Sequence, residues 1–254
     1  MKLSIIIPAY NEEQRIGMML DDYCRYFAKM PKGSVEILVV LNGCRDHTLD
    51  VVKHFTKKYH FLHYADIPRA IGKGGAVIEG FKRARGDLVG YADADGATAA
   101  VHFHKLVGSL HRADGAIASR WMPGAVVQPR QPFQRRFASR AFNLLIKLLF
   151  RLSYYDTQCG CKLFKREVVA AVLPALGTTR WAFDVDLLYQ LKRRQFTIRE
   201  VPTTWKDKTG SSIRVLRVSA EMFLALVRLR LVYSPFRFVV GAYNKVAGSL
   251  GIRF

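Results

Sequence analysis

Two carboxylates follow the apolar run Leu88–Ala92, in the short segment Asp93-Ala94-Asp95. Carboxylate oxygens are the ligands that Mg²⁺ and Mn²⁺ prefer in proteins. A cation held by both side chains could neutralise a departing diphosphate. A turn rich in aspartate is the alternative, because the pattern is short and common by chance. Its position at the end of an apolar run favours a metal site formed by Asp93 and Asp95.

The segment Arg69–Gly75 places Lys73 between glycines at the expected start of a helix. Its spacing is not that of the P-loop, GxxxxGK[ST]. Backbone N–H groups and an ammonium at a helix start can nevertheless bind a phosphate group. An ordinary glycine-rich entry into a helix explains the segment equally well, so both interpretations stay open.

Polar side chains lie beside aromatic ones in two further segments, 156–160 and 181–186. Carboxylate and amide hydrogen bonds under an aromatic face suit a hexose, which makes both segments candidates for sugar binding. A capped turn and a half-buried helix are the alternatives, and the helix is favoured for Asp186. His102 and His104 have no evident third metal ligand. The four cysteines lack CxxC spacing, which predicts reduced thiols in a cytosolic protein.

Apolar runs and helix-like segments alternate along the first 120 residues. The runs predict strands, and the segments between them predict amphipathic helices. This order is typical of an α/β fold with a mostly parallel, Rossmann-like sheet and helices on both faces. The expected strands are Leu3–Ile7, Val35–Leu41, Phe61–Ala65, Leu88–Ala92 and Ala116–Ser119, and the expected helices are Glu12–Ala28, Leu49–Tyr59 and Gly74–Ala84.

Ligands of such folds bind at the carboxyl ends of the strands. Polar residues of this chain gather where the first, second and fourth strands are expected to end. We therefore expect a site at that edge of the sheet, containing Asn11, Glu12, Asn42, Asp93 and Asp95.

Basic amphipathic segments dominate the second half. A proline-bearing loop at 123–132 precedes a long helix expected at Arg135–Leu152, and two more helices are expected at Leu216–Val232 and Phe236–Phe254. Their charged positions are almost all Lys or Arg, as in helices that lie at a membrane interface. We therefore divide the chain into a globular domain, 1–212, and basic amphipathic C-terminal helices, 213–254, which could lie on a membrane or pair in a homo-oligomer.

The positive charge is concentrated in one half of the chain. Of the 254 residues, half are hydrophobic and 24% are charged, which excludes a disordered chain. The net charge of +20 comes mostly from residues 120–254, with 24 basic and 7 acidic residues, against 16 and 13 in residues 1–119. An anionic partner is implied: nucleic acid, phosphate groups or an acidic membrane surface. No uncharged apolar run of 18 residues occurs, and Pro8 interrupts the apolar N-terminus, so neither a spanning helix nor a signal peptide is expected.

Six segments, in this order, resemble inverting family 2 glycosyltransferases of the GT-A fold: IIIPAYNEE, EILVVLNGCRDHT, GKGGAV, YADADGAT, DTQCGCKLF and RWAFDVDLL. Residues 3 to about 215 are most similar to dolichyl-phosphate β-glucosyltransferases, with dolichyl-phosphate mannose synthases the next relatives. The resemblance implies transfer of a hexose from a nucleotide sugar to a polyprenyl phosphate, dolichyl or undecaprenyl, at the cytoplasmic face of a membrane. UDP-glucose is the expected donor, and Mg²⁺ or Mn²⁺ the expected cofactor.

The resemblance also implies roles for individual residues. Asp95, Arg120 and Arg135 are the expected catalytic residues, and Asp93 and Asp95 the metal ligands. The acceptor phosphate would bind Arg135, Ser139 and Arg140, the sugar Asp156, Gln158 and Trp181, and the nucleotide Pro8, Ala9, Tyr10, Glu12, Asn42, Lys73 and Asp93.

Two departures bear on specificity. Asn42 stands where the family usually has an aspartate that reads the base, and an amide both donates and accepts hydrogen bonds. Ala97 stands where the mannose synthases have a glutamine that helps the metal, as in the glucosyl relatives. Asn42 leaves the base of the nucleotide open, with UDP favoured, and Ala97 favours glucose as the sugar.

The acceptor decides which catalytic groups are needed. A phosphate is already anionic near neutral pH, so no strong general base is required. Catalysis would rest on aligning the phosphate with the anomeric carbon and on stabilising the leaving diphosphate. Three alternatives remain: mannosyl transfer from GDP-mannose, a family 2 enzyme with a glycan acceptor and Asp184 or Asp186 as base, and a nucleic-acid-binding protein. The last is disfavoured, because the basic residues alternate with apolar ones and no nucleic-acid motif occurs.

Overall fold

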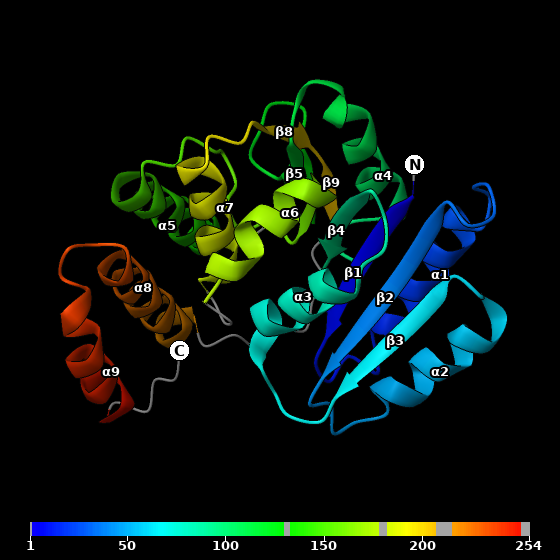
Figure 1. Ribbon diagram of the computed structural model, residues 1–254, viewed down its shortest axis with the longest axis horizontal. Coiled ribbons are helices and arrows are strands. Elements are labelled where there is room, and N and C mark those ends of the chain that lie inside the picture. Colours follow the sequence, from blue (N-terminus) through cyan, green and yellow to red (C-terminus); the bar gives the residue numbers. More distant parts are fainter. Residues whose placement is uncertain (1, 130–132, 178–181, 207–214, 250–254) are drawn as a thin grey trace.

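A twisted seven-stranded sheet forms the centre of the molecule (Figure 1). The computed structural model describes residues 2–129, 133–177, 182–206 and 215–249. The strand order is β3-β2-β1-β4-β7-β5-β8, and neighbours are parallel except where β7 pairs with β4 and β5. The strands are β1 Leu3–Ala9, β2 Val35–Asn42, β3 Leu62–Ile67, β4 Leu88–Ala92, β5 Gly115–Ser119, β7 Cys161–Lys165 and β8 Ile198–Pro202.

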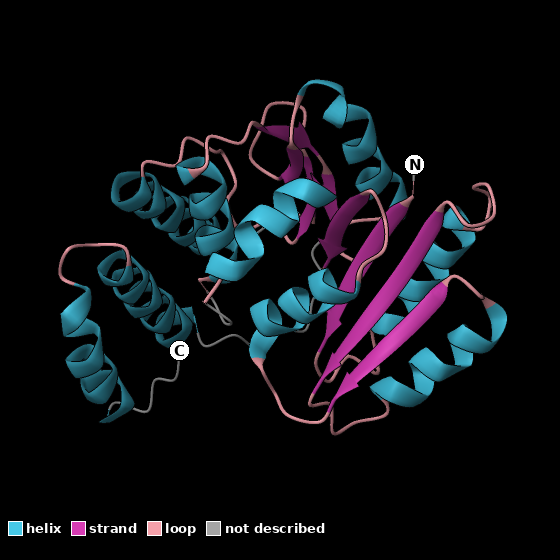
Figure 2. Cartoon of the chain, in the orientation of Figure 1, coloured by secondary structure: helices cyan, strands magenta, loops and turns pink. Residues whose placement is uncertain are grey.

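Helices cover both faces of this sheet (Figure 2). One face packs against α1 Ile16–Phe27, α2 Thr48–Lys58 and α4 Ala100–Gly108, and the other against α3 Gly72–Arg83, α6 Arg166–Val172 and α7 Phe183–Arg193. The buried strands read as nearly continuous apolar runs because both of their faces are covered. This arrangement confirms the expected α/β class.

The reversed direction of β7 matters for the site. Ala92, at the end of β4, pairs with Cys161, at the start of β7. The residues that precede β7 therefore lie at the same edge as the residues that follow β4. The backbone N–H of Asp93 accordingly donates to the carbonyl oxygen of Gly160, at 2.9 Å.

The first of the C-terminal helices, α8 Val215–Val232, shares a core with the rest of the chain. Its Leu226 and Leu229 are buried in the same cluster as Ile146 and Phe150 of α5 Phe133–Phe150. No helix in the described part of the chain is long and apolar enough to cross a membrane. The division at residue 212 stays a proposal. The last helix of the described chain is α9 Val240–Ser249.

The expected strands and the first three helices are confirmed, with shifted ends. The helix expected from Glu12 begins at Ile16, because residues 13–15 form a turn in which the carbonyl oxygen of Glu12 accepts from the N–H groups of Arg15 and Ile16. The expected loop at 123–132 contains a strand, β6 Val126–Gln128, paired with β9 Thr204–Lys206. The helix expected at Phe236–Phe254 is a short 3₁₀ turn, Arg237–Val239, followed by α9, with residues 250–254 outside the described part.

Candidate active site

The Asp93-Ala94-Asp95 turn lies at the edge where β4 ends and β7 begins. A carboxylate oxygen of Asp95, Oδ1, accepts from the backbone N–H of Ala97 at 2.9 Å, and Gly96 turns the chain with a φ of 67°. Gly160 lies against Asp93 so closely that a Cβ atom there would stand 1.8 Å from Oδ2. A glycine at 160 is therefore what allows the Asp93 carboxylate to sit at this edge.

Lys73, in the first turn of α3, lies beside this turn. Its Nζ is 2.7 Å from Oδ1 of Asp93 and 3.6 Å from Oδ2 of Asp184. The side chain of Lys73 is 35% exposed, so part of it faces solvent. Although burial lowers it, the two carboxylates raise the pKa of Lys73 above its usual range. The ammonium therefore stays charged and available to an anion.

Asp184, in the first turn of α7, is the most engaged carboxylate of the cluster. Its Oδ1 accepts from Nζ of Lys162, which is fully buried, and from the hydroxyl of Tyr91, each at 2.5 Å. Lys162 also donates to the carbonyl oxygen of Cys159 at 2.6 Å. Burial raises the pKa of Asp184, but the ammonium groups of Lys162 and Lys73 outweigh it and hold the pKa below its usual range. The group is thus a fixed anion and a poor proton acceptor.

The pair Asp93 and Asp95 fits a hard divalent cation. Burial raises the pKa of Asp93, and the neighbouring Asp95 carboxylate adds to the rise, while Lys73 opposes it. Two carboxylates brought together without full compensation favour a cation between them. In the described residues no group of three or more His, Cys, Asp and Glu could hold a metal ion, so oxygens of water or of a bound ligand would have to complete the shell.

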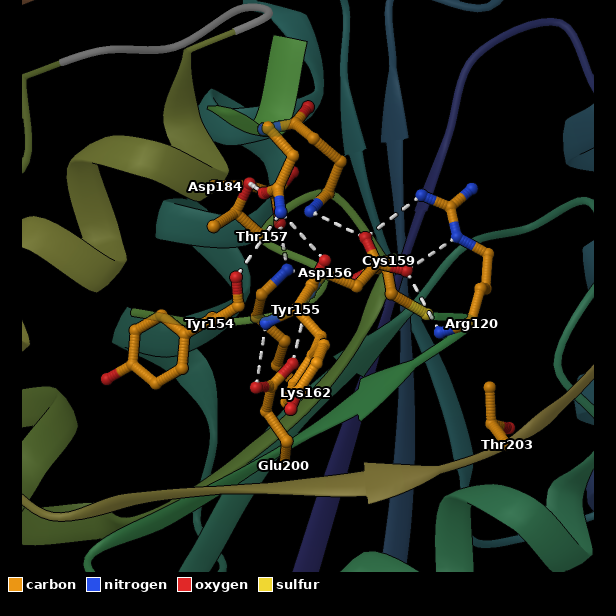
Figure 3. A network of polar contacts seen from close by, with 12 residues as sticks. Arg120, Tyr154, Tyr155, Asp156, Thr157, Cys159, Lys162, Asp184, Glu200 and Thr203 are labelled. Atoms are coloured by element: carbon orange, nitrogen blue, oxygen red, sulfur yellow. Dashed lines mark hydrogen bonds and ion pairs between the residues drawn. The ribbon is translucent and has the colours of Figure 1, made fainter. Parts of the chain in front are cut away.

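Arg120 and Asp156 form a nearly buried ion pair next to this cluster (Figure 3). The guanidinium donates from Nε at 2.7 Å and from Nη2 at 3.0 Å, and the backbone N–H of Arg120 also donates to Asp156, at 3.0 Å. Asp156 is 2% exposed. Its carboxylate is therefore committed to Arg120, whose guanidinium also lies 5.4 Å from the ring of Trp205.

Backbone contacts hold the segment that carries Asp156. The carboxylate of Glu200 on β8 accepts from the N–H groups of Tyr155 and Asp156, at 2.8 and 3.0 Å (Figure 3). The amide of Asn143 on α5 donates to the carbonyl oxygens of Tyr154 and Tyr155, at 3.3 and 2.8 Å. The segment is thus fixed from the sheet on one side and from α5 on the other.

The expected nucleotide residues lie at the ends of β1 and β2. Pro8 and Ala9 end β1, and Tyr10 follows with 52% of its surface exposed. Glu12 is bound by the guanidinium of Arg15, at 2.7 Å from both nitrogens. Asn42 is only 4% exposed, and its Oδ1 accepts from the N–H of Ile71 at 2.6 Å, which fastens the loop before α3.

The expected acceptor and sugar residues are described only in part. Arg135 lies within α5, but its side chain and all of Trp181 fall outside the described residues. Ser139 is half-buried, and the exposed Arg140 lies 5.7 Å from the ring of Trp121. Gln158 is half-buried, and its buried Nε2 has no hydrogen-bond partner among the described residues. The roles of these residues stay predictions.

Several residues of the site were not predicted from the sequence. Lys162 carried one signal, since a lysine inside the apolar run Cys161–Phe164 must find a buried anion. Nothing in the spacing indicated the others, because their partners are distant in sequence: Tyr91, Asn143, Gly160, Glu200 and Trp205. His104, which had been considered as a metal ligand, instead shares a hydrogen bond with the hydroxyl of Tyr26, at 2.8 Å.

Comparisons with known proteins identify the family of this chain. Residues 4–173 match the family described as glycosyl transferase family 2. The dolichyl-phosphate beta-glucosyltransferase of Drosophila melanogaster is 36% identical over 245 residues, covering 90% of this chain and 75% of its own. That of Mus musculus is 33% identical over 256 residues, covering 96% and 78%.

Solved structures show the same fold. Glucosyl-3-phosphoglycerate synthase from Mycobacterium tuberculosis, in complex with uridine diphosphate, superposes with a TM-score of 0.70 at 16% identity, over 92% of this chain and 82% of its own. The same enzyme with Mn²⁺, uridine diphosphate and glucosyl-3-phosphoglycerate gives 0.69 at 18% identity, over 90% and 79%. The sheet and its helices thus have the fold of GT-A glycosyltransferases. The chain belongs to glycosyl transferase family 2, and it is a glycosyltransferase.

Proposed function

We propose that this chain transfers glucose from UDP-glucose to a polyprenyl phosphate, with inversion at the anomeric carbon. The names of the relatives support a phosphorylated polyprenol as acceptor, and Ala97 supports glucose. The observation that carries most weight is the state of the two carboxylates that could serve as a base. Asp184 is held by two ammonium groups, and Asp186 is fully buried with its Oδ1 2.6 Å from the Tyr233 hydroxyl. Transfer to a phosphate needs neither of them as a base.

The acidic and basic residues at this edge of the sheet would have different roles in the reaction. Asp93 and Asp95 would hold Mg²⁺ or Mn²⁺, which when bound supplies positive charge to the diphosphate of the donor. The Lys73 ammonium adds a second positive group to the same side. Arg120, oriented by Asp156, lies nearby with donors left over from its ion pair. These groups would stabilise the leaving diphosphate and bring two anions together.

Arg135, Ser139 and Arg140 on α5 would hold the acceptor phosphate. Ser139 is half-buried and Arg140 is exposed, and the guanidinium of Arg140 lies over the ring of Trp121. The segment 154–155 is bound to Asn143 on the same helix. A phosphate on α5 would therefore approach the part of the chain that orients Arg120 and carries Gln158, the candidate sugar ligand.

A membrane surface is the proposed location of the acceptor. Exposed apolar residues of α5 and of the segment 236–246 include Leu148 at 71% and Phe238 at 77% exposure. Exposed basic residues accompany them on these elements or directly after α5: Arg140, Arg151, Arg237 and Lys245. Apolar side chains interleaved with cations suit the interface of an anionic bilayer.

A donor panel tests the proposed reaction. The purified full-length chain would be mixed with labelled UDP-glucose, UDP-N-acetylglucosamine or GDP-mannose, a polyprenyl phosphate and Mg²⁺ or Mn²⁺. We expect label from UDP-glucose to enter the organic phase. Asp95→Ala should abolish this transfer, whereas Asp21→Asn, in an exposed pair with Arg25 on α1, should not change it. Label that enters from GDP-mannose instead, or that stays in water on a glycan, would refute the proposal.

A further inference from the structure

Two lysines and two aspartates alternate in the site, with Lys162 and Asp184 buried and Lys73 and Asp93 partly exposed. Lys73 lies between Asp93 and Asp184, at 2.7 and 3.6 Å, and Lys162 binds the other oxygen of Asp184. The hydroxyl of Tyr91 donates a hydrogen bond to Asp184, and the centre of its ring lies 5.8 Å from the Lys73 ammonium. Asp184 is therefore held by three side chains, while the side chain of Lys73 is 35% exposed and so less confined.

The position of Lys73 conflicts with a cation at Asp93. An ammonium 2.7 Å from Oδ1 occupies one of the oxygens that a divalent ion would use, and it repels that ion strongly at short range. The ammonium has to leave Asp93 when the ion arrives. Left without a carboxylate in this partly buried place, the ammonium would lose much of the compensation for its charge.

We propose that Asp184 is a positioning residue that takes the Lys73 ammonium from Asp93 when a divalent cation binds. A short movement of the lysine side chain converts the 3.6 Å separation into a full ion pair. The transfer frees Asp93 for the metal and keeps the ammonium at the site, where it can meet the diphosphate. Lys162 and Tyr91 fix the receiving carboxylate. This inference rests on the metal site of the proposed function.

Mn²⁺ binding in the absence of nucleotide and acceptor tests the transfer. Free Mn²⁺ would be measured by electron paramagnetic resonance against the full-length chain, with four proteins forming a cycle: wild type, Asp184→Asn, Lys73→Met and the double variant. We expect Asp184→Asn to weaken Mn²⁺ binding about tenfold, because the displaced ammonium then meets only an amide. In the Lys73→Met background no ammonium needs a new partner, so the same change should cost about threefold or less.

The outcomes separate this inference from the metal site itself. Equal costs of Asp184→Asn in both backgrounds would overturn the transfer, because Asp184 would then act only through its distant charge. A wild-type chain that binds no Mn²⁺ would overturn the metal site as well. Asp114→Asn is the matched control, since Asp114 pairs with Lys165 at the opposite end of β7, and it should leave Mn²⁺ binding unchanged. Asp184→Glu should restore binding in part, and thermal melting of each variant shows that it is folded.

Discussion

At the scale of single residues, the site depends on contacts that only one residue type satisfies. Gly160 leaves room for the Asp93 carboxylate, Lys162 places a charge in the interior opposite Asp184, and Asp156 gives both oxygens to Arg120. None of these contacts lies within one element. Each joins segments that are far apart in sequence, and each can be tested by a small change.

Gly160→Ala should disable the metal site with little other damage. The added Cβ would stand 1.8 Å from Oδ2 of Asp93, so that the carboxylate must turn away. We expect Mn²⁺ binding and glucosyl transfer to fall at least about tenfold, which corresponds to about 1.4 kcal/mol. Gly108→Ala is the control, because nothing lies within 4 Å of a Cβ at that position. Unchanged Mn²⁺ binding in Gly160→Ala would contradict the packing argument.

Asp156→Ala should lower the free energy of unfolding by about 3 to 5 kcal/mol, because it leaves the largely buried Arg120 guanidinium without its partner. The pair also makes stability depend on pH. Burial raises the pKa of Asp156, but Arg120 outweighs it and holds the pKa below its usual range. The unfolded chain therefore takes up a proton first, and the contribution of Asp156, complete at neutral pH, is lost as the pH falls below about 4.

Urea unfolding of the wild type and of Asp156→Asn, at pH 7 and at decreasing pH, measures this dependence. The difference in stability between the two proteins should shrink toward acid pH. A difference in stability that stays constant down to pH 3 would mean that Arg120 does not lower the pKa of Asp156. The segment 156–160 suggested that Asp156 binds the sugar. It could not reveal the ion pair, because Arg120 is 36 residues away in sequence.

At the scale of elements, the sequence allowed prediction of those parts of the sheet that are built from long apolar runs. β1, β2 and β4 are buried on both faces, so their patterns are plain. β7 was not predicted, because two of its five residues are lysines and its short apolar run does not mark its direction. That direction brings Gly160 to Asp93, so the meeting of the two motifs could not be read from spacing.

Helix α7 joins the site to the C-terminal helices. Asp184 and Asp186 both stand in its first turn. Asp186 and Gln190, which lies about one turn after Asp186, meet the hydroxyl of Tyr233 directly after α8, at 2.6 and 2.5 Å. The ring of Tyr233 also lies 5.3 Å from that of Tyr189. The polar contacts are thus added to an aromatic contact that a phenylalanine would keep.

Tyr233→Phe should weaken the attachment of α8 and leave the site intact. Loss of the hydroxyl should reduce the free energy of unfolding by about 1 to 2 kcal/mol. Chemical unfolding followed by tryptophan fluorescence measures the loss, and Mn²⁺ binding should match the wild type. Tyr10→Phe, at a residue that is 52% exposed, is the control and should not alter stability. A stability equal to the wild type would show that the hydroxyl contributes nothing to holding α8.

At the scale of the whole molecule, the excess positive charge of the second half can be assigned to one side of the fold. The basic second half includes Arg120 in the site and the helices α5, α8 and α9, which lie together on one side of the fold, away from α1 and α2 (Figure 1). A membrane on that side would bring its lipid acceptors to α5. The remaining cations would then contact lipid headgroups.

Binding to vesicles tests this orientation. The full-length chain should sediment with vesicles that contain anionic phospholipid and less with neutral ones, and more salt should weaken the binding, because exposed charges are screened over about 10 Å at 0.1 M. Replacing Leu148 and Phe238 by serine removes two side chains that are 71% and 77% exposed, and it should weaken binding at least about tenfold if each inserts partly, since full burial of one such side chain is worth about 1.5 to 3 kcal/mol. Met18→Ser, at a residue 60% exposed on α1, should bind like the wild type. If Met18→Ser loses as much vesicle binding as the double variant, the proposed orientation is wrong. The two proteins should differ only if α5 and the segment 236–246 face the bilayer.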